Sequence, residues 1–174
     1  MPIVLGNAKA SSGRITYGTY DLLEHPTGGA EQLPVVIAQG DARGPTFWLT
    51  AGIHGNEHAG LQVLHLLLCD ELVKSLTGTI ICVPALNPAG LRTMTRWAYY
   101  HRGDPNRLFP DGKPRRSVDP DCDPPSVLEQ AYSRLFEEVQ ATADFWIDLH
   151  NTWTGSISTA YRDRVYFRND GSVP

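Results

Sequence analysis

Apolar and polar residues alternate along much of the amino-terminal part of the chain, a pattern that predicts β-strands. The segment 14–23 alternates in this way and is rich in Thr, Tyr and Ile, which favour extended backbone. Shorter apolar segments follow at 34–39 and 46–50, and turn-forming residues at 25–29 and 40–44 separate the three. We therefore expect three strands before residue 51.

Helical periodicity replaces the alternation after this point. Apolar residues recur at helical spacing over about 57–75, which predicts one long helix. A β-branched apolar segment at 79–83 predicts a short central strand. The segment 84–125 is rich in proline and shows no periodicity, so we expect a long loop with a functional role.

A second helix and a further strand are expected after that loop. Asp123 can cap this helix, and Pro124 and Pro125 suit its first turn. Its apolar face extends over 128–139, and the segment 144–149 predicts a strand. The alternation of strands and helices predicts an α/β fold, in which helices cover a sheet.

Composition and charge limit the class of protein. The 174 residues fit a single domain, 1–174, and a net charge of −4 argues against a nucleic-acid partner. The longest strongly apolar stretch, 61–69, is too short to span a membrane, and the N-terminus lacks a secretory signal. Cys69, Cys82 and Cys122 form no CxxC pair, so we expect reduced thiols in a cytoplasmic protein.

Two segments at strand ends carry the candidate chemistry. The first, AGIHGNEHAG at 51–60, places His54 and Glu57 three residues apart across a glycine-bounded turn. The second, DLHNTWTG at 148–155, has His150 at the end of the last expected strand. Functional sites of α/β sheets form at the carboxyl ends of strands. Two imidazoles and one carboxylate there predict a catalytic zinc ion with an open position for water.

Further side chains complete the candidate site. Asp148 lies two residues before His150, hence on the same face of the strand, where it could orient the imidazole. In the long loop, the guanidinium of Arg107, next to Asn106, suits a substrate carboxylate, and Arg96 could stabilise an oxyanion. Four other arginines are expected to be solvated: Arg92, Arg102, Arg115 and Arg116.

Five motifs occur in an order that resembles the succinylglutamate desuccinylase and aspartoacylase family, the deacylase branch of the zinc carboxypeptidase superfamily. The motifs are HGNE at 54–57, LNPAGL at 86–91, TRW at 95–97, NRLFP at 106–110 and DLHNT at 148–152. The resemblance extends over about 45–155. It implies a zinc-carboxypeptidase-like (phosphorylase/hydrolase-like) α/β fold, with a mixed β-sheet flanked by helices.

The resemblance also implies roles for individual residues. The implied ligands of one Zn²⁺ ion are His54, Glu57 and His150. Asn106 and Arg107 match the residues that hold a substrate carboxylate, and Arg96 matches the arginine that polarises the scissile carbonyl. The family's substrates are N-acyl amino acids, so the resemblance implies a zinc-dependent hydrolase that cleaves the amide or ester bond of such a small molecule.

Two departures from the family pattern matter. Family members read DLNR where this chain has Pro105 between Asp104 and Asn106, and proline fixes φ and removes a donor. The family's general base is a glutamate after the last zinc histidine, whereas the last glutamate here is Glu138. Because family members are also longer, we expect either the N-terminal part of a longer protein or a naturally short relative. An incomplete sheet would leave apolar surface uncovered, which favours a homo-oligomer.

Three alternatives remain open. HGNEH also fits the inverted HxxEH zinc-protease motif, with His54 and His58 as ligands and Glu57 as base, although the flanking glycines oppose a helical His54. A metallocarboxypeptidase acting on peptides would need the same zinc-bound water and arginine clamp. A zinc-binding domain with little activity would agree with the missing base.

Overall fold

The computed structural model describes residues 3–110, 125–152 and 155–161, and the sheet dominates this part of the chain. Its five strands are β3 (Arg14–Glu24), β4 (Ala30–Gln39), β5 (Ala42–Ala51), β6 (Thr77–Val83) and β7 (Phe145–Leu149). Their order is β3-β4-β6-β5-β7, with antiparallel pairing from β3 to β6 and parallel pairing of β5 with β6 and β7. The expected mixed sheet is therefore confirmed.

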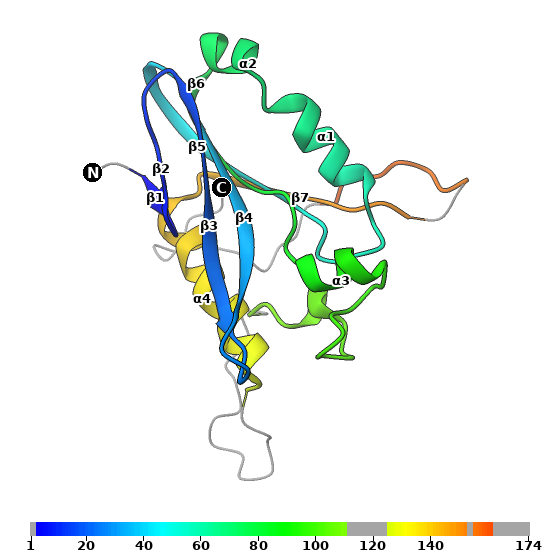
Figure 1. The fold of residues 1–174 in the computed structure, drawn as a ribbon. Helices are drawn as coiled ribbons and strands as arrows, with labels where there is room; N and C mark the ends of the chain where they lie inside the picture. The colour runs from blue at the N-terminus through cyan, green and yellow to red at the C-terminus, as the bar shows by residue number, and fades with distance from the viewer. Residues whose placement is uncertain (1–2, 111–124, 153–154, 162–174) are drawn as a thin grey trace.

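Helices cover both faces of this sheet (Figure 1). Helices α1 (Ala59–Leu67) and α2 (Asp70–Ser75) lie on one face, and α4 (Val127–Thr142) lies on the other. Side chains alternate along β5, so Trp48 packs into the core beneath α4, whereas Leu49 packs into the core beneath α1. Burial on both faces explains the continuous apolar stretch of β6, whose last six residues are all buried.

The prediction of one helix over 57–75 is wrong in one respect, because the helix is interrupted at Leu68 and Cys69. Leu68 leaves helical geometry with ψ 77°, and Cys69 is extended with φ −125° and ψ 165°. Asp70 and Glu71 then occupy the first turn of α2, where carboxylates favour a helix start. Periodicity alone does not register this break, since Leu72 and Val73 continue the apolar pattern across it.

The expectation of a long irregular loop over 84–125 is also wrong in its described part. It contains α3 (Pro88–Thr93) and a one-turn 3-10 helix, η1 (Pro105–Arg107). Each begins with proline directly after a capping side chain, Asn87 for α3 and Asp104 for η1. Both helix starts follow the same local rule, a capping side chain followed by proline, but the many prolines of this segment favoured the prediction of a loop.

The first ten residues and the start of α4 also differ from the expectation. A two-stranded sheet of β1 (Val4–Leu5) and β2 (Ala8–Lys9) precedes β3, and its strands are too short for a periodic signal. Helix α4 begins after Ser126, whose hydroxyl accepts from the backbone N–H of Glu129. The Glu129 carboxylate in turn accepts from the backbone N–H of Ser126. The expected cap, Asp123, lies outside the described residues.

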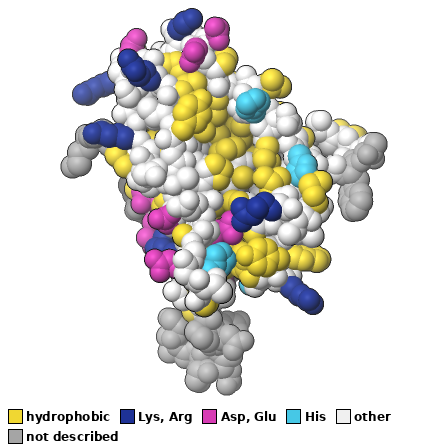
Figure 2. Space-filling model, in the orientation of Figure 1, with side chains coloured by type: hydrophobic (Ala, Val, Ile, Leu, Met, Phe, Trp, Pro, Cys, Tyr) yellow, Lys and Arg dark blue, Asp and Glu magenta, His cyan; other side chains and the backbone are white. Residues whose placement is uncertain are grey.

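Apolar side chains remain on the surface of the described part. Hydrophobic residues gather in a strip over the upper half of the face seen in Figure 2. On β7, one of the two edge strands of the described sheet, Phe145 and Ile147 are each 47 % exposed. Self-association stays a prediction.

Cys69 and Cys82 are free thiols, as expected, and Cys122 lies outside the described residues. No helix in the described ranges is long and apolar enough to cross a bilayer.

Candidate metal centre

The parallel pairing of β5 with β7 brings the two motif segments together. Thr50 pairs with Asp148 and Ala51 with Leu149, so both strands end at the same edge of the sheet. The chain after β5 turns through Gly52, which has φ +65°, and a Cβ on Gly55 would lie 2.0 Å from the backbone of α3. Glycine is required at both places, and the turn leads directly to His54.

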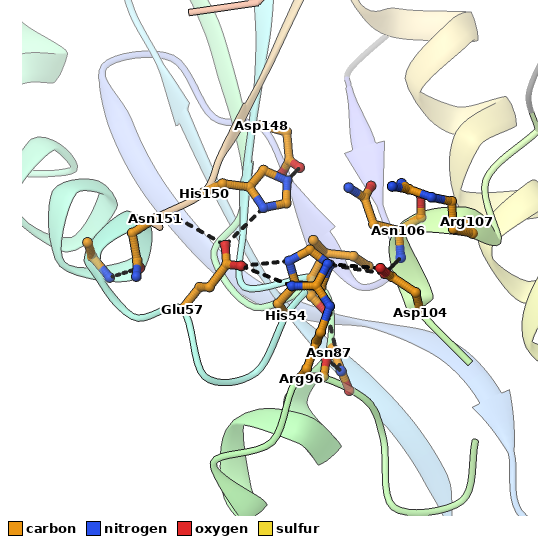
Figure 3. A network of polar contacts seen from close by, with 12 residues as sticks. His54, Glu57, Asn87, Arg96, Asp104, Asn106, Arg107, Asp148, His150 and Asn151 are labelled. Carbon is orange, nitrogen blue, oxygen red and sulfur yellow. Dashed lines mark hydrogen bonds and ion pairs between the residues drawn. The ribbon is translucent and has the colours of Figure 1, made fainter. Parts of the chain in front are cut away.

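Three side chains from these segments converge on one point. One ligand atom from each of His54, Glu57 and His150 lies within 4.8 Å of the other two. The Glu57 carboxylate lies between the imidazoles, with Oε1 2.8 Å from Nδ1 of His54 and Oε2 2.9 Å from Nδ1 of His150 (Figure 3). His54 is buried, at 3 % exposed. The donor set is the one that the sequence predicts for a metal.

The far nitrogen of each imidazole is held by an aspartate. Nε2 of His54 lies 3.0 Å from Oδ1 of Asp104, and Nε2 of His150 lies 2.7 Å from Oδ2 of Asp148. Because an ionised carboxylate only accepts, each aspartate accepts the proton on Nε2 of its imidazole. With that proton on Nε2, Nδ1, the nitrogen that faces Glu57, is the atom through which each imidazole could bind a metal ion.

The charges of the site favour a protonated His150 and an ionised Asp104, so a metal ion would displace a proton from His150. The hydrogen bond to Asp148 is the main cause that raises the pKa of His150 to about 9; burial opposes it, and Glu57 adds to it. Burial would raise the pKa of Asp104, but hydrogen bonds from Arg96, His54 and the backbone of Asn106 outweigh it and lower that pKa to about 2. Asp104 is therefore an anion at neutral pH.

Sequence reasoning named Asp104 only as the neighbour of Pro105, the departure from DLNR, and missed the contact of Asp104 with His54. The signal was present, since an aspartate before proline is a typical helix cap, and its side chain accepts from the backbone N–H of Asn106 at 3.0 Å. The Pro105 ring fits the first position of η1, where no N–H is needed. The departure from DLNR therefore leaves the carboxylate in place.

Arg96 lies beside the candidate ligands. Its Nη2 donates to Oδ2 of Asp104 at 2.8 Å, and its Nη1 lies 3.6 Å from Oε1 of Glu57. The buried Asn87 amide donates to the backbone carbonyls of Ile53 and Arg96, at 3.2 and 3.4 Å. Asn87 thus joins the segment that carries His54 to the segment that carries Arg96, a connection that sequence reasoning missed.

Asn106 and Arg107 follow Asp104 and are placed differently from the metal-binding set. Figure 3 shows them beyond Asp104, on the side of His54 away from Glu57. Arg107 is exposed, and its Nη1 donates to the backbone carbonyl of Asn106 at 3.1 Å. Their role in holding a substrate carboxylate stays a prediction.

Two interpretations of single residues are corrected. Arg92 is not merely solvated, because its Nη2 donates at 2.8 Å to the buried carboxylate of Glu31. His58 precedes α1, and its Nε2 lies 2.9 Å from the carbonyl of Gly55, outside the converging set. His54 lies in a turn before the helix, which contradicts the HxxEH interpretation.

One further residue of the last motif also supports the site. The backbone N–H of Asn151 donates to Oε2 of Glu57 at 3.1 Å, and its side-chain oxygen accepts from the N–H of Ala59 at 3.0 Å. Asn151 therefore holds the Glu57 carboxylate and closes the start of α1 at the same time.

Several known proteins are similar to this chain in sequence. The succinylglutamate desuccinylase/aspartoacylase catalytic domain model matches residues 43–166. An N-alpha-acetyl-L-2,4-diaminobutyric acid deacetylase of Halomonas elongata is 30 % identical over 123 residues, which are 71 % of this chain and 33 % of that protein. A succinylglutamate desuccinylase of Yersinia enterocolitica is 31 % identical over 109 residues, 62 % of this chain and 32 % of the relative.

Solved structures agree on the fold. The ectoine utilization protein EutE (DoeB) of Ruegeria pomeroyi, in a product-bound structure, matches with a TM-score of 0.61 and 25 % identity, over 85 % of this chain and 42 % of that one. The chain thus spans about a third of the length of the curated relatives that it matches. Because the family model covers most of the chain, this protein belongs to the succinylglutamate desuccinylase/aspartoacylase catalytic-domain family.

Proposed function

We propose that this chain carries the metal centre of a zinc-dependent hydrolase that cleaves the acyl group from an N-acyl amino acid. The observation that supports this most strongly is the convergence of His54, Glu57 and His150, with both Nδ1 atoms directed at one point. Two neutral imidazoles and a carboxylate fit zinc, and they leave a fourth position open. A bound zinc ion would lower the pKa of its water toward ~7 and polarise a carbonyl oxygen.

The chain's own residues would do the rest of the binding. The Arg96 guanidinium, held by Asp104 and next to Glu57, can donate to the oxygen of a scissile carbonyl as negative charge develops there. Asn106 and the planar fork of Arg107 would hold the carboxylate of the substrate. Asp148 would keep His150 in the tautomer that binds metal.

The substrate class follows from the relatives. The names of the Halomonas and Yersinia enzymes both describe removal of an acyl group, acetyl in one case and succinyl in the other, from an amino acid. Such substrates combine an amide with a carboxylate, which Arg96 and Arg107 would bind at two separate positions. We also propose a cytoplasmic setting, in which the Cys69 and Cys82 thiols stay reduced.

A second candidate function is a zinc-binding unit with little activity of its own. No glutamate follows Glu138 in the sequence, and in the described ranges the carboxylates around the metal site are Glu57, Asp104 and Asp148. Each of them already contacts an imidazole. Proton transfer to the leaving amine typically contributes ~10²–10⁴-fold, so a chain without a base would bind zinc and hydrolyse slowly.

The test is an assay of the full chain with one equivalent of zinc. Release of free amine is followed from N-acetyl-2,4-diaminobutyrate and N-succinylglutamate, with a peptide that has a free C-terminus as the carboxypeptidase alternative. We expect zinc-dependent release from an N-acyl amino acid, abolished in His150→Ala. Peptide hydrolysis alone would favour the carboxypeptidase, and zinc binding without hydrolysis would favour the zinc-binding unit.

A further inference from the structure

A line of hydrogen bonds leads from the core of the sheet to one of the candidate metal ligands. The indole Nε1 of Trp146 donates to the hydroxyl of Thr50 at 2.9 Å, and this hydroxyl donates to Oδ1 of Asp148 at 2.6 Å. The other oxygen of Asp148 accepts from Nε2 of His150 at 2.7 Å. Three residues on two neighbouring strands, together with His150 directly after β7, thus form a continuous line of hydrogen bonds that ends at the candidate metal site.

Chemistry fixes the direction of every donor along this line. An indole N–H only donates, so the Thr50 oxygen must accept from Trp146. The single hydroxyl proton is then left for Asp148, whose ionised carboxylate only accepts. With Oδ1 occupied by the hydroxyl, Oδ2 accepts from Nε2 of His150. The order of donors therefore keeps a proton on Nε2, so that a metal ion would bind His150 through Nδ1 in place of the proton there.

The sheet register places these side chains together. Thr50 pairs directly with Asp148, and Trp146 precedes Asp148 by two residues, so all three lie on the same face. Thr50 is only 1 % exposed. A valine would fill nearly the same volume without the cost of burying a hydroxyl, so the hydroxyl is expected to contribute through its hydrogen bonds.

We propose that Thr50, with Trp146 behind it, is a positioning residue for the metal site. Thr50 holds the Asp148 carboxylate in the one orientation that fixes the tautomer and the ring angle of His150. This inference rests on the proposed zinc function. Thr50 would touch neither metal nor substrate, so its effect must pass through Asp148.

The experiment measures the zinc affinity of the full chain by competition with a chromophoric chelator. Thr50→Val should weaken zinc binding about 10-fold, at the lower end of the ~10–100-fold typical of groups behind a metal ligand, and Thr50→Ser should stay within about twofold of wild type. In an Asp148→Asn background, Thr50→Val should cause no further loss. Thr46→Val is the matched control, since Thr46 is buried on the same strand and face and contacts Asp144 through its backbone.

A second variant covers the case in which Thr50→Val fails to fold, because that change removes the hydroxyl that accepts from the Trp146 N–H. Thr50→Val combined with Trp146→Phe removes donor and acceptor together, and it should bind zinc about 10-fold more weakly than wild type. Unchanged zinc affinity in the folded variants, or a loss that persists fully beside Asp148→Asn, would overturn this inference alone. Absence of zinc binding by the wild-type chain would overturn the proposed function and this inference with it.

Discussion

Replacement of Asp104 tests the electrostatics of the site most sharply. The Asp104 carboxylate accepts from Arg96 at 2.8 Å, from the Asn106 backbone at 3.0 Å and from His54 at 3.0 Å. Asp104→Asn keeps the shape and removes the charge. The metal-free variant should therefore be less stable than the wild type at neutral pH, and the difference should depend on pH.

The magnitude follows from the pKa of Asp104, which is lowered from 3.8 to about 2. At roughly 1.4 kcal/mol per pKa unit, this difference corresponds to an upper limit of about 2 kcal/mol. Since the side chain is 28 % exposed, solvent screening reduces the expected loss to about 1–2 kcal/mol. A lowered pKa stabilises the fold above the unfolded value near 4, and this contribution is lost as pH falls through about 2.

The assay is urea unfolding of both proteins in the presence of a chelator, followed by tryptophan fluorescence between pH 2 and 7. The free energies of unfolding should differ by about 1–2 kcal/mol at pH 7 and converge as the pH approaches 2. Glu71→Gln is the control, because Glu71 is 79 % exposed and 3.8 Å from Lys74, and it should change stability by less than about 0.5 kcal/mol. An equal difference at pH 7 and pH 2, or none at either, would refute the reasoning.

Two further predictions concern residues away from the metal site. Arg92→Ala should destabilise the protein by roughly 1–3 kcal/mol in urea unfolding, because Glu31 is 3 % exposed and loses a charged hydrogen-bond partner. Lys74→Ala on the surface should have almost no effect, and equal effects of the two variants would contradict a stabilising role of the Arg92–Glu31 pair. Burial raises the pKa of the Cys82 thiol to about 12, so iodoacetamide at pH 8 should alkylate Cys69 and leave Cys82 intact until the protein unfolds, as read by peptide mass spectrometry. Rapid alkylation of Cys82 in the native protein would show that β6 opens easily.

The sequence predicted the sheet strands and the converging ligands because both depend on local patterns. Thr46 to Thr50 and Phe145 to Leu149 are short apolar segments bounded by turn residues, and the chemistry-bearing histidines follow directly at their ends. Their approach in space then follows from parallel pairing, since two neighbouring parallel strands end at one edge. Family motifs added the assignment of ligands to His54, Glu57 and His150.

The residues that hold the candidate ligands in place, such as Asp104 and Thr50, were less predictable because their roles depend on contacts between distant segments. The contact of Asp104 with His54 spans 50 residues, and the contact of Thr50 with Asp148 spans 98. No periodicity encodes such pairs. The break between α1 and α2 was missed because apolar residues continue the helical pattern across Leu68 and Cys69.

The central claim is that His54, Glu57 and His150 bind one zinc ion, and anomalous diffraction at the zinc edge from crystals of the zinc-loaded full chain tests it most directly. The account predicts one anomalous peak between the three side chains, at about 2.0–2.2 Å from Nδ1 of each histidine and from a Glu57 oxygen. A peak bound through Nε2, a peak at another cluster, or no peak at saturating zinc would contradict the account.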